Sequence, residues 1–188
     1  MLRIAVVGLG KMGVSHLALL NAHPHVDVVA VCDSAGYVLD GLAKYTGLKT
    51  YRDYPAMLRE AALDAVLIAT PSSLHASMVK TALDRDLHVF CEKPFSLSTI
   101  EGAALARLAT FKNRICQVGY HNRFVGSFAE AKRLVDAGVI GRISHIFAES
   151  YGAVIMSPRV DLGARSAHKA EAAFMITPPI RSTLSIGW

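Results

Sequence analysis

The chain has 188 residues, of which 52% are hydrophobic and 19% charged, a composition typical of one full globular domain with part of another. Its first hydrophobic run is six residues long and is broken by glycines, which excludes a signal peptide or a membrane span and predicts a cytoplasmic protein. The net charge is +5, but lysines and arginines are spread singly with no aromatic platform between them, so no nucleic-acid partner is expected.

The chain opens with a strand, a glycine turn and a helix. Leu2–Val7 is a short apolar run typical of a buried parallel strand, and a G-x-G-x-x-G segment follows it directly. Gly8 would make the tight turn, Gly10 would let backbone N–H groups approach a pyrophosphate, and Gly13 would let the helix pack on the strand. The positive end of the helix dipole would then face the phosphates. The pattern predicts a dinucleotide site formed by Gly8, Leu9, Gly10, Met12 and Gly13.

The second predicted strand, Val26–Cys32, ends at Asp33, twenty residues beyond Gly13. A carboxylate there would accept hydrogen bonds from the adenosine ribose and repel a 2′-phosphate, so NAD is the expected cofactor and NADP the less favoured one. Two alternatives stay open. Asp33 would merely cap the turn at 34–36, or the glycine turn would belong to a methyltransferase that binds a different nucleotide.

After this unit the sequence keeps alternating strand and helix patterns, which predicts a parallel sheet. The further predicted strands are Lys49–Tyr51, Asp64–Ala69, Leu87–Cys91 and Ile115–Val118. The predicted helices are Ser15–Ala22, Tyr37–Tyr45, Asp53–Glu60, one capped by Ser72 or Ser73 that runs to Asp84, and Ser98–Phe111. The fold class is therefore α/β, a doubly wound parallel-sheet Rossmann fold.

The three cysteines, Cys32, Cys91 and Cys116, lie near the ends of predicted strands, with no C-x-x-C and no Cys/His cluster. We expect them to be small buried hydrophobic residues rather than metal ligands or disulfide partners. The eight histidines are also dispersed, so no metal is expected.

Polar segments follow three of the predicted strands. Residues 70–75 read Thr-Pro-Ser-Ser-Leu-His, residues 92–94 read Glu-Lys-Pro, and residues 119–124 read Gly-Tyr-His-Asn-Arg-Phe. Carboxyl ends of parallel strands meet at one edge of a sheet, and open α/β sheets bind ligands there. The three segments are therefore expected to converge on one rim.

Taken in order, the glycine motif, Asp33 and the three polar segments resemble the Gfo/Idh/MocA oxidoreductases, the family of glucose-fructose oxidoreductase and inositol dehydrogenase. The resemblance covers roughly residues 1–152. It implies hydride transfer between a nicotinamide cofactor and a hydroxyl of a small sugar or polyol, and a homo-oligomer for a full-length member. It also implies further cofactor contacts from Thr70, Pro71, His75, Glu92, Lys93 and Asn122.

Lys93 is the predicted catalytic residue. In the family the lysine of this motif lies by the nicotinamide and helps to bind and polarise the substrate hydroxyl, and partial burial would favour its neutral form. The alternative for Lys93 is a solvated surface lysine. Glu92 is expected to contact the cofactor or orient Lys93 rather than to act as the main base. His75 would lie near the cofactor, with a helix-packing histidine as the alternative. Tyr120 and Arg123 would reach the nicotinamide or an anionic substrate group, and an ion pair within the turn is the alternative for Arg123.

Residues 1–122 form the expected NAD(P)-binding domain, and residues 123–171 the beginning of an α+β substrate domain. In that second part the sequence predicts a helix over Ser127–Ala137 ended by Gly138, and a strand over Arg142–Glu149 that in the family opens a large sheet.

The last segment departs from the family pattern, because its catalytic Asp and His have no counterpart in residues 172–188. Regrouping the degenerate codons from Glu171 by one base permits a peptide that contains Asp-Tyr-Ala-Ser-His, which matches the family segment. We therefore expect an aberrant tail produced by a frameshift near Glu171. The alternative to a dehydrogenase is then a truncated NAD-binding module with impaired catalysis.

Overall fold

A computed structural model of the chain describes residues 1–147 and 149. The elements in chain order are β1 (Leu2–Val7), α1 (Lys11–Asn21), β2 (Val26–Cys32), α2 (Gly36–Thr46), β3 (Lys49–Tyr51), α3 (Tyr54–Glu60), β4 (Ala65–Ile68), α4 (Ser72–Asp84), β5 (His88–Cys91), α5 (Thr99–Phe111), β6 (Cys116–Val118), a 3-10 turn η1 (His121–Phe124) and α6 (Gly126–Asp136). The first compact unit is Met1–Ala131, and it contains all of the described strands.

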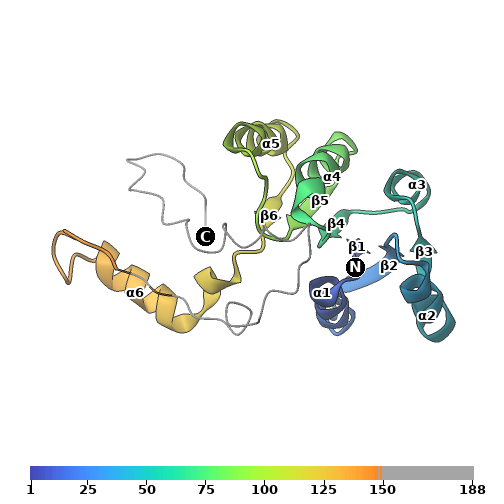
Figure 1. Cartoon of the computed structure of the whole chain (residues 1–188), viewed down its shortest axis with the longest axis horizontal. Coiled ribbons are helices and arrows are strands. Elements are labelled where there is room, and N and C mark those ends of the chain that lie inside the picture. Colours follow the sequence, from blue (N-terminus) through green and yellow to red (C-terminus); the bar gives the residue numbers. More distant parts are fainter. Residues whose placement is uncertain (148, 150–188) are drawn as a thin grey trace, which may run out of the picture. The chain divides into compact units, whose positions relative to one another are not determined.

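The six strands form one parallel sheet in the order β3-β2-β1-β4-β5-β6 (Figure 1). β1 and β4 are neighbours, with Ile4 paired to Ala65. The strand order changes direction between these two strands, so their carboxyl ends form the switch point at which open α/β sheets bind ligands. The predicted doubly wound Rossmann fold is confirmed.

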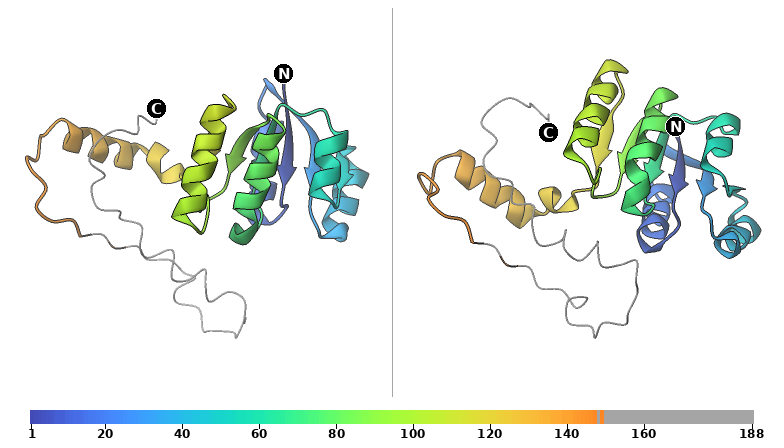
Figure 2. Two further views of the ribbon diagram at one scale, coloured as in Figure 1. Left: turned by 90° about the horizontal axis from the view of Figure 1, so that it is seen from above. Right: turned by 45° about the horizontal axis from the view of Figure 1, so that its top comes forward.

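Helices cover both faces of this sheet (Figure 2). α1 and α2 lie on one face, and α3, α4 and α5 lie on the other. Alternate residues of each strand point into the two layers. Val6 packs with Leu17 and Leu39 on the first face, whereas Val7 belongs to the core with Met57 on the second. Because β4 and the last four residues of β1 are covered on both sides, these stretches read as continuous apolar runs rather than as alternating ones.

Caps explain where three of the predicted helices begin or end. The side chains of Ser98 and Asp53 each accept a hydrogen bond from a backbone N–H three residues later, at the starts of α5 and α3. Gly47 ends α2 in the left-handed conformation, with φ 69°. The predicted serine cap of α4 is wrong. Ser72 is itself the first helical residue and is buried, and Pro71 precedes it without a side-chain cap bond.

The predicted strand over Arg142–Glu149 is also wrong in its described part. Residues 142–147 carry no strand. α6 ends at Asp136, and Gly138 follows with φ 68°. The remainder of the expected second domain and the expected aberrant tail, residues 150–188, lie outside the described residues, so these domain assignments stay predictions.

The cysteines are small hydrophobic residues of the sheet, as predicted. Cys32 and Cys91 are buried and Cys116 is half-buried. Burial raises the pKa of Cys32 and Cys116 to about 11 and that of Cys91 to about 12. All three thiols therefore stay protonated at neutral pH and are poor nucleophiles.

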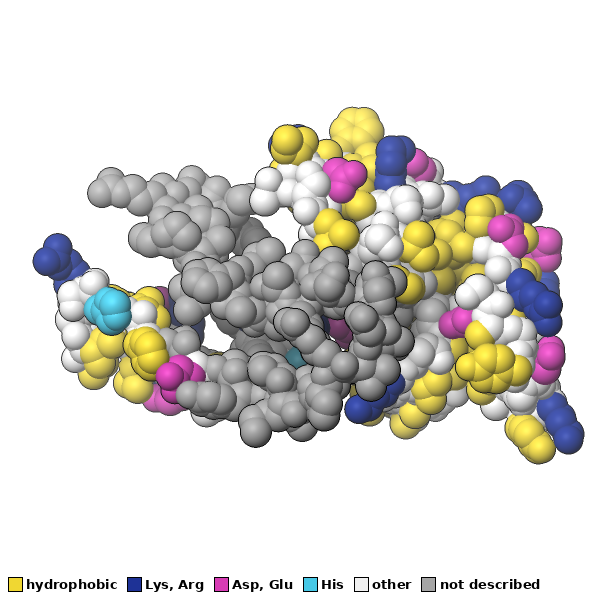
Figure 3. All heavy atoms as spheres, viewed as in Figure 1, with side chains coloured by type: hydrophobic (Ala, Val, Ile, Leu, Met, Phe, Trp, Pro, Cys, Tyr) yellow, Lys and Arg dark blue, Asp and Glu magenta, His cyan; other side chains and the backbone are white. Residues whose placement is uncertain are grey.

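Charges of both signs share the surface of the sheet domain. On the face drawn in Figure 3, lysine and arginine side chains lie among acidic and hydrophobic ones. This mixed distribution agrees with the sequence, in which lysines and arginines occur singly rather than in runs. In the part of the chain that the structure describes, no helix combines the length and the hydrophobicity needed to cross a bilayer.

Candidate functional site

The glycine turn after β1 is packed directly against the end of β4. Gly8 has φ +87°, and a Cβ built on it would lie 2.7 Å from the carbonyl carbon and oxygen of Ala69. A Cβ on Gly13 would lie 1.7 Å from the carbonyl oxygen of Gly8. Only glycine fits at either place. The predicted roles of these two glycines, a tight turn and close packing of helix on strand, are confirmed.

The N-terminus of α1 opens in front of this turn. Gly10 is the N-cap residue without a side-chain cap bond, and a Cβ built on it would meet nothing within 4 Å. The first helical N–H bond runs from Val14 to the Gly10 carbonyl, and the first turn holds no acidic residue. The preceding N–H groups, those of Lys11, Met12 and Gly13, have no acceptor within the helix. The end of α1 thus offers free donors and a positive dipole to an anion such as a pyrophosphate.

Leu9 and Met12 differ in what they can offer to a ligand. The Leu9 side chain is 4% exposed and belongs to the core, so that only its backbone faces the turn. Met12 is 47% exposed beside the open helix end. Their predicted contacts with a cofactor stay predictions.

Asp33 lies at the end of β2, beside the glycine turn. Its carboxylate accepts one hydrogen bond from the Leu9 N–H and one of 2.8 Å from the Ala35 N–H. The turn-capping alternative is therefore realised, and the same carboxylate also ties the end of β2 to the glycine turn. Arg52, which the sequence patterns did not single out, lies against Gly36, where a Cβ would come within 2.3 Å of its Nη2. The adenosine-binding role of Asp33 stays a prediction.

His75 links the two turns that follow β4 and β5. It is 1% exposed, its Nδ1 lies 2.6 Å from the Pro94 carbonyl oxygen, and its Nε2 lies 2.9 Å from the Thr70 carbonyl oxygen. A neutral imidazole donates only one of these two bonds. This geometry favours the structural alternative, in which His75 holds both turns in place. The cofactor contacts predicted for Thr70, Pro71 and His75 stay predictions.

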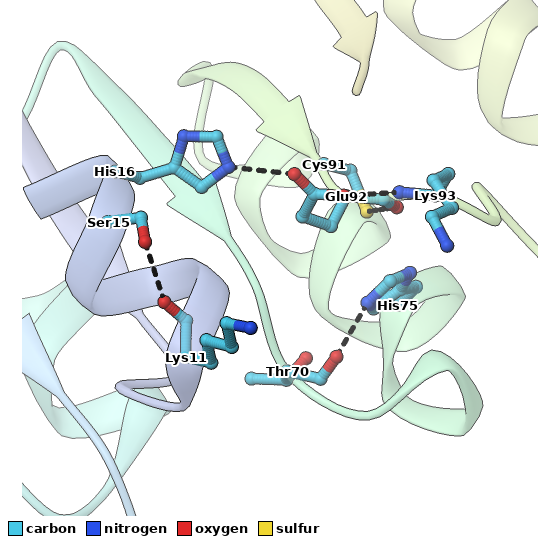
Figure 4. Close-up of polar contacts among 8 residues, drawn as sticks. All are labelled: Lys11, Ser15, His16, Thr70, His75, Cys91, Glu92 and Lys93. Atoms are coloured by element: carbon cyan, nitrogen blue, oxygen red, sulfur yellow. Dashed lines mark hydrogen bonds and ion pairs between the residues drawn. The ribbon is translucent and has the colours of Figure 1, made fainter. Parts of the chain in front are cut away.

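The Glu-Lys-Pro segment brings Lys93 to the same rim (Figure 4). The Lys93 side chain is exposed, so the partial burial considered for it is not seen among the described residues. Glu92 is half-buried, and its Oε1 lies 2.7 Å from Nε2 of His16 on α1. Sequence reasoning missed His16. Its place three residues after Gly13, on the face of α1 that turns toward the sheet, was the available signal.

The segment after β6 forms the short 3-10 turn η1, which was not predicted. Tyr120, Asn122 and Arg123 are all exposed there. The Arg123 guanidinium lies over the Tyr120 ring, 5.6 Å from its centroid. No ion pair of Arg123 is found within the described residues, so the cation–π contact replaces the expected ion-pair alternative. Substrate contact by Tyr120 and Arg123, and cofactor contact by Asn122, stay predictions.

Known proteins are similar to this chain in sequence and in fold. Relative to scyllo-inositol 2-dehydrogenase (NAD(+)) of Bacillus subtilis, the chain is 36% identical over 142 residues, 74% of this chain and 42% of that protein. The rhizopine catabolism protein MocA of Rhizobium meliloti is 33% identical, over 75% of this chain and 44% of that protein. The crystal structure of scyllo-inositol dehydrogenase from Lactobacillus casei with bound NAD(H) and scyllo-inositol has a TM-score of 0.71 at 32% identity, over 77% of this chain and 43% of that chain.

The chain thus spans less than half the length of the relatives it matches. The model of the oxidoreductase family with an NAD-binding Rossmann fold, GFO_IDH_MocA, matches residues 2–120. That range holds the whole described sheet, the glycine turn and the Lys93 segment. With more than half of its residues matched, this chain belongs to the Gfo/Idh/MocA oxidoreductase family.

Proposed function

We propose that this chain is the cofactor-binding part of an NAD(P)-dependent dehydrogenase. The enzyme would oxidise a hydroxyl group of a polyol or sugar, or reduce the corresponding carbonyl group. The observation that carries the proposal is the glycine turn, closed against β4 and followed by an unobstructed helix end. Family membership and the polyol substrates named for the relatives support it. Cytoplasmic location and assembly into a homo-oligomer stay predictions, the second of which light scattering would test.

The residues present fit a dinucleotide. The free N–H groups at the start of α1 would hold the pyrophosphate, with Gly10 leaving space for its approach. Asp33 would accept hydrogen bonds from the adenosine ribose, for which it exchanges its present bond to Leu9. A 2′-phosphate would meet the same carboxylate, so we infer a preference for NAD over NADP.

Lys93 would act on the substrate. The chemistry that NAD(P) supplies when bound is the acceptance or return of a hydride. The exposed Lys93 ammonium donates a hydrogen bond to the substrate oxygen, and in its neutral form the amine accepts the hydroxyl proton. Arg123 and Tyr120, at the neighbouring strand end, would orient the substrate on that side of the rim.

Calorimetric titration of the folded chain with NADH, NADPH and S-adenosylmethionine tests the binding half of the proposal. We expect NADH to bind most tightly and S-adenosylmethionine not to bind. A folded chain that binds no NADH, or that binds S-adenosylmethionine instead, would overturn the proposal. The turnover assay described next compares the variant Lys93→Met with Lys80→Met as its matched control. Lys80 is an exposed lysine on α4 that pairs with Asp84 outside the rim.

A binding module without turnover is the second candidate. Its support is that Lys93, Tyr120 and Arg123, the side chains expected to meet a substrate, are all exposed to water. Incubation with NAD and scyllo-inositol or myo-inositol, followed through NADH absorbance, separates the two candidates. Turnover that Lys93→Met abolishes and Lys80→Met preserves supports the dehydrogenase, and tight NADH binding with no turnover supports the module.

A further inference from the structure

The Glu92 carboxylate lies one residue before Lys93, yet both of its oxygens are engaged elsewhere. Oε1 lies 2.7 Å from Nε2 of His16, and Oε2 accepts a hydrogen bond of 3.2 Å from the backbone N–H of Lys93. Since a carboxylate only accepts, Nε2 of His16 must be the donor. Within the described residues, the Lys93 ammonium forms no ion pair with Glu92 or with any other carboxylate.

Two further contacts fix the carboxylate on the α1 side. The His16 ring meets the Phe90 ring of β5 edge to face, with centroids 5.4 Å apart, and the His16 and Glu92 side chains are 19% and 12% exposed. At the end of β6, a Cβ on Gly119 would lie 3.1–3.2 Å from the carboxyl atoms of Glu92. Glycine at 119 therefore leaves the space that the carboxylate fills.

The alternative for the Glu92 carboxylate is to turn toward the Lys93 ammonium. Glu92 and Lys93 are neighbours in sequence beyond the end of β5, and opposite charges attract each other modestly even where one of them is exposed to water. Figure 4 shows the Glu92 side chain turned toward His16, with the Lys93 ammonium on the far side of the Glu92 backbone from that contact. In this structure the Glu92 carboxylate therefore contacts His16 and the Lys93 backbone, and not the Lys93 ammonium.

We propose that His16 is a positioning residue that holds the Glu92 carboxylate against α1 and so keeps the Lys93 ammonium free to meet a substrate hydroxyl. The inference rests on the proposed function only in assigning the substrate to Lys93. α1 also carries the helix end proposed to hold the pyrophosphate, so the same contact joins that helix to the Lys93 segment.

The test measures how fast the Lys93 amine reacts, which needs neither cofactor nor turnover. The folded chain is acetylated with a water-soluble succinimidyl ester, and mass spectrometry gives the rate at Lys93 relative to that at Lys44, an exposed lysine on α2. Only the neutral amine reacts, and a carboxylate partner stabilises the charged form. A Glu92 released from His16 should therefore slow acetylation of Lys93.

Two variants of similar size separate hydrogen bonding from packing. His16→Leu keeps an apolar side chain against Phe90 but removes the hydrogen-bond donor. We expect it to lower the acetylation rate at Lys93, relative to that at Lys44, by about threefold. His16→Gln keeps a donor, and we expect a rate close to that of the original chain. Adding Glu92→Gln to His16→Leu removes the competing charge and should restore the rate. His25→Leu, at an exposed histidine outside the site, is the matched control.

An unchanged Lys93 rate in folded His16→Leu would overturn the inference, as would slowing that persists after Glu92→Gln is added. If His16→Leu does not fold, Glu92→Gln with His16 intact carries the test. That variant should leave the Lys93 rate at or above the original value, and a slower rate would contradict the inference. Loss of NADH binding with normal labelling would count against the proposed function alone.

Discussion

Replacing Gly13 with alanine should destabilise the whole fold rather than only the cofactor site. The new Cβ would lie 1.7 Å from the Gly8 carbonyl oxygen and 2.8 Å from its carbonyl carbon, so α1 and the glycine turn would have to separate by more than about 1 Å. Overpacking costs about 1–3 kcal/mol when side chains can adjust. Here the obstacle is backbone, so we expect a loss of about 3 kcal/mol or more in the free energy of unfolding.

Gly10→Ala is the matched control within the same motif. A Cβ on Gly10 meets nothing within 4 Å, and its φ of −67° suits alanine. We expect the free energy of unfolding to change by less than about 1 kcal/mol. The methyl group would nevertheless stand where a pyrophosphate approaches the helix end, so NADH should bind at least about tenfold more weakly, a loss of about 1.4 kcal/mol.

Urea unfolding followed by circular dichroism, together with calorimetric NADH titration, measures both effects. With an m-value near 2 kcal/mol/M, Gly13→Ala should lower the urea midpoint by about 1.5 M, while Gly10→Ala leaves it nearly unchanged. Equal midpoints for the two variants would refute the packing argument. Unchanged NADH affinity in Gly10→Ala would refute the placement of the pyrophosphate.

Three other substitutions test the cofactor preference, the pH response and a helix cap. Asp33→Ser should raise the affinity for NADPH relative to NADH by about tenfold, and tighter binding of NADPH than NADH by the original chain would contradict this reasoning. Hydrogen bonds from Arg3 hold the pKa of Asp64 well below its usual range, so the pair adds stability above about pH 4, and this is lost as pH falls through the folded-state pKa. Arg3→Gln should therefore unfold more easily at neutral pH and lose that difference in acid, as urea midpoints at several pH values would show. Asp53→Ala removes the cap of α3 and should lower the free energy of unfolding by about 1 kcal/mol, whereas Asp40→Ala on the exposed side of α2 should change it far less.

Local patterns were enough to locate most of the sheet. β2 begins and ends where the sequence predicts, because a largely apolar run bounded by turn residues is itself the cause of a buried strand. The short strand β3, which reads Lys-Thr-Tyr, also has the predicted bounds. The Ser98 cap was likewise readable, because its hydrogen bond closes within three residues. At Ser72 the same reasoning failed, since Pro71, with ψ 140°, already occupies the position of the cap.

The contacts that build the site were not readable in this way. His16 meets Glu92 across 76 positions of sequence, and no periodic pattern encodes a pair so far apart. Arg52 and Gly36 meet only because β3 ends beside the start of α2. The exposure of Lys93 depends on what packs over the rim, which a motif of three residues does not specify.

Because β1 pairs with β4, the site can form only after β4 has been translated. Arg3 and Asp64 lie 61 residues apart, so the glycine turn emerges from the ribosome long before the strand end that closes it. Until β4 has joined β1, Gly8 has no Ala69 against which to turn, and long-range parallel pairing is slow to form. A ligand of this site can therefore recognise only chains whose sheet has closed across its middle. By mass action, cellular dinucleotide would draw newly made chains toward that state.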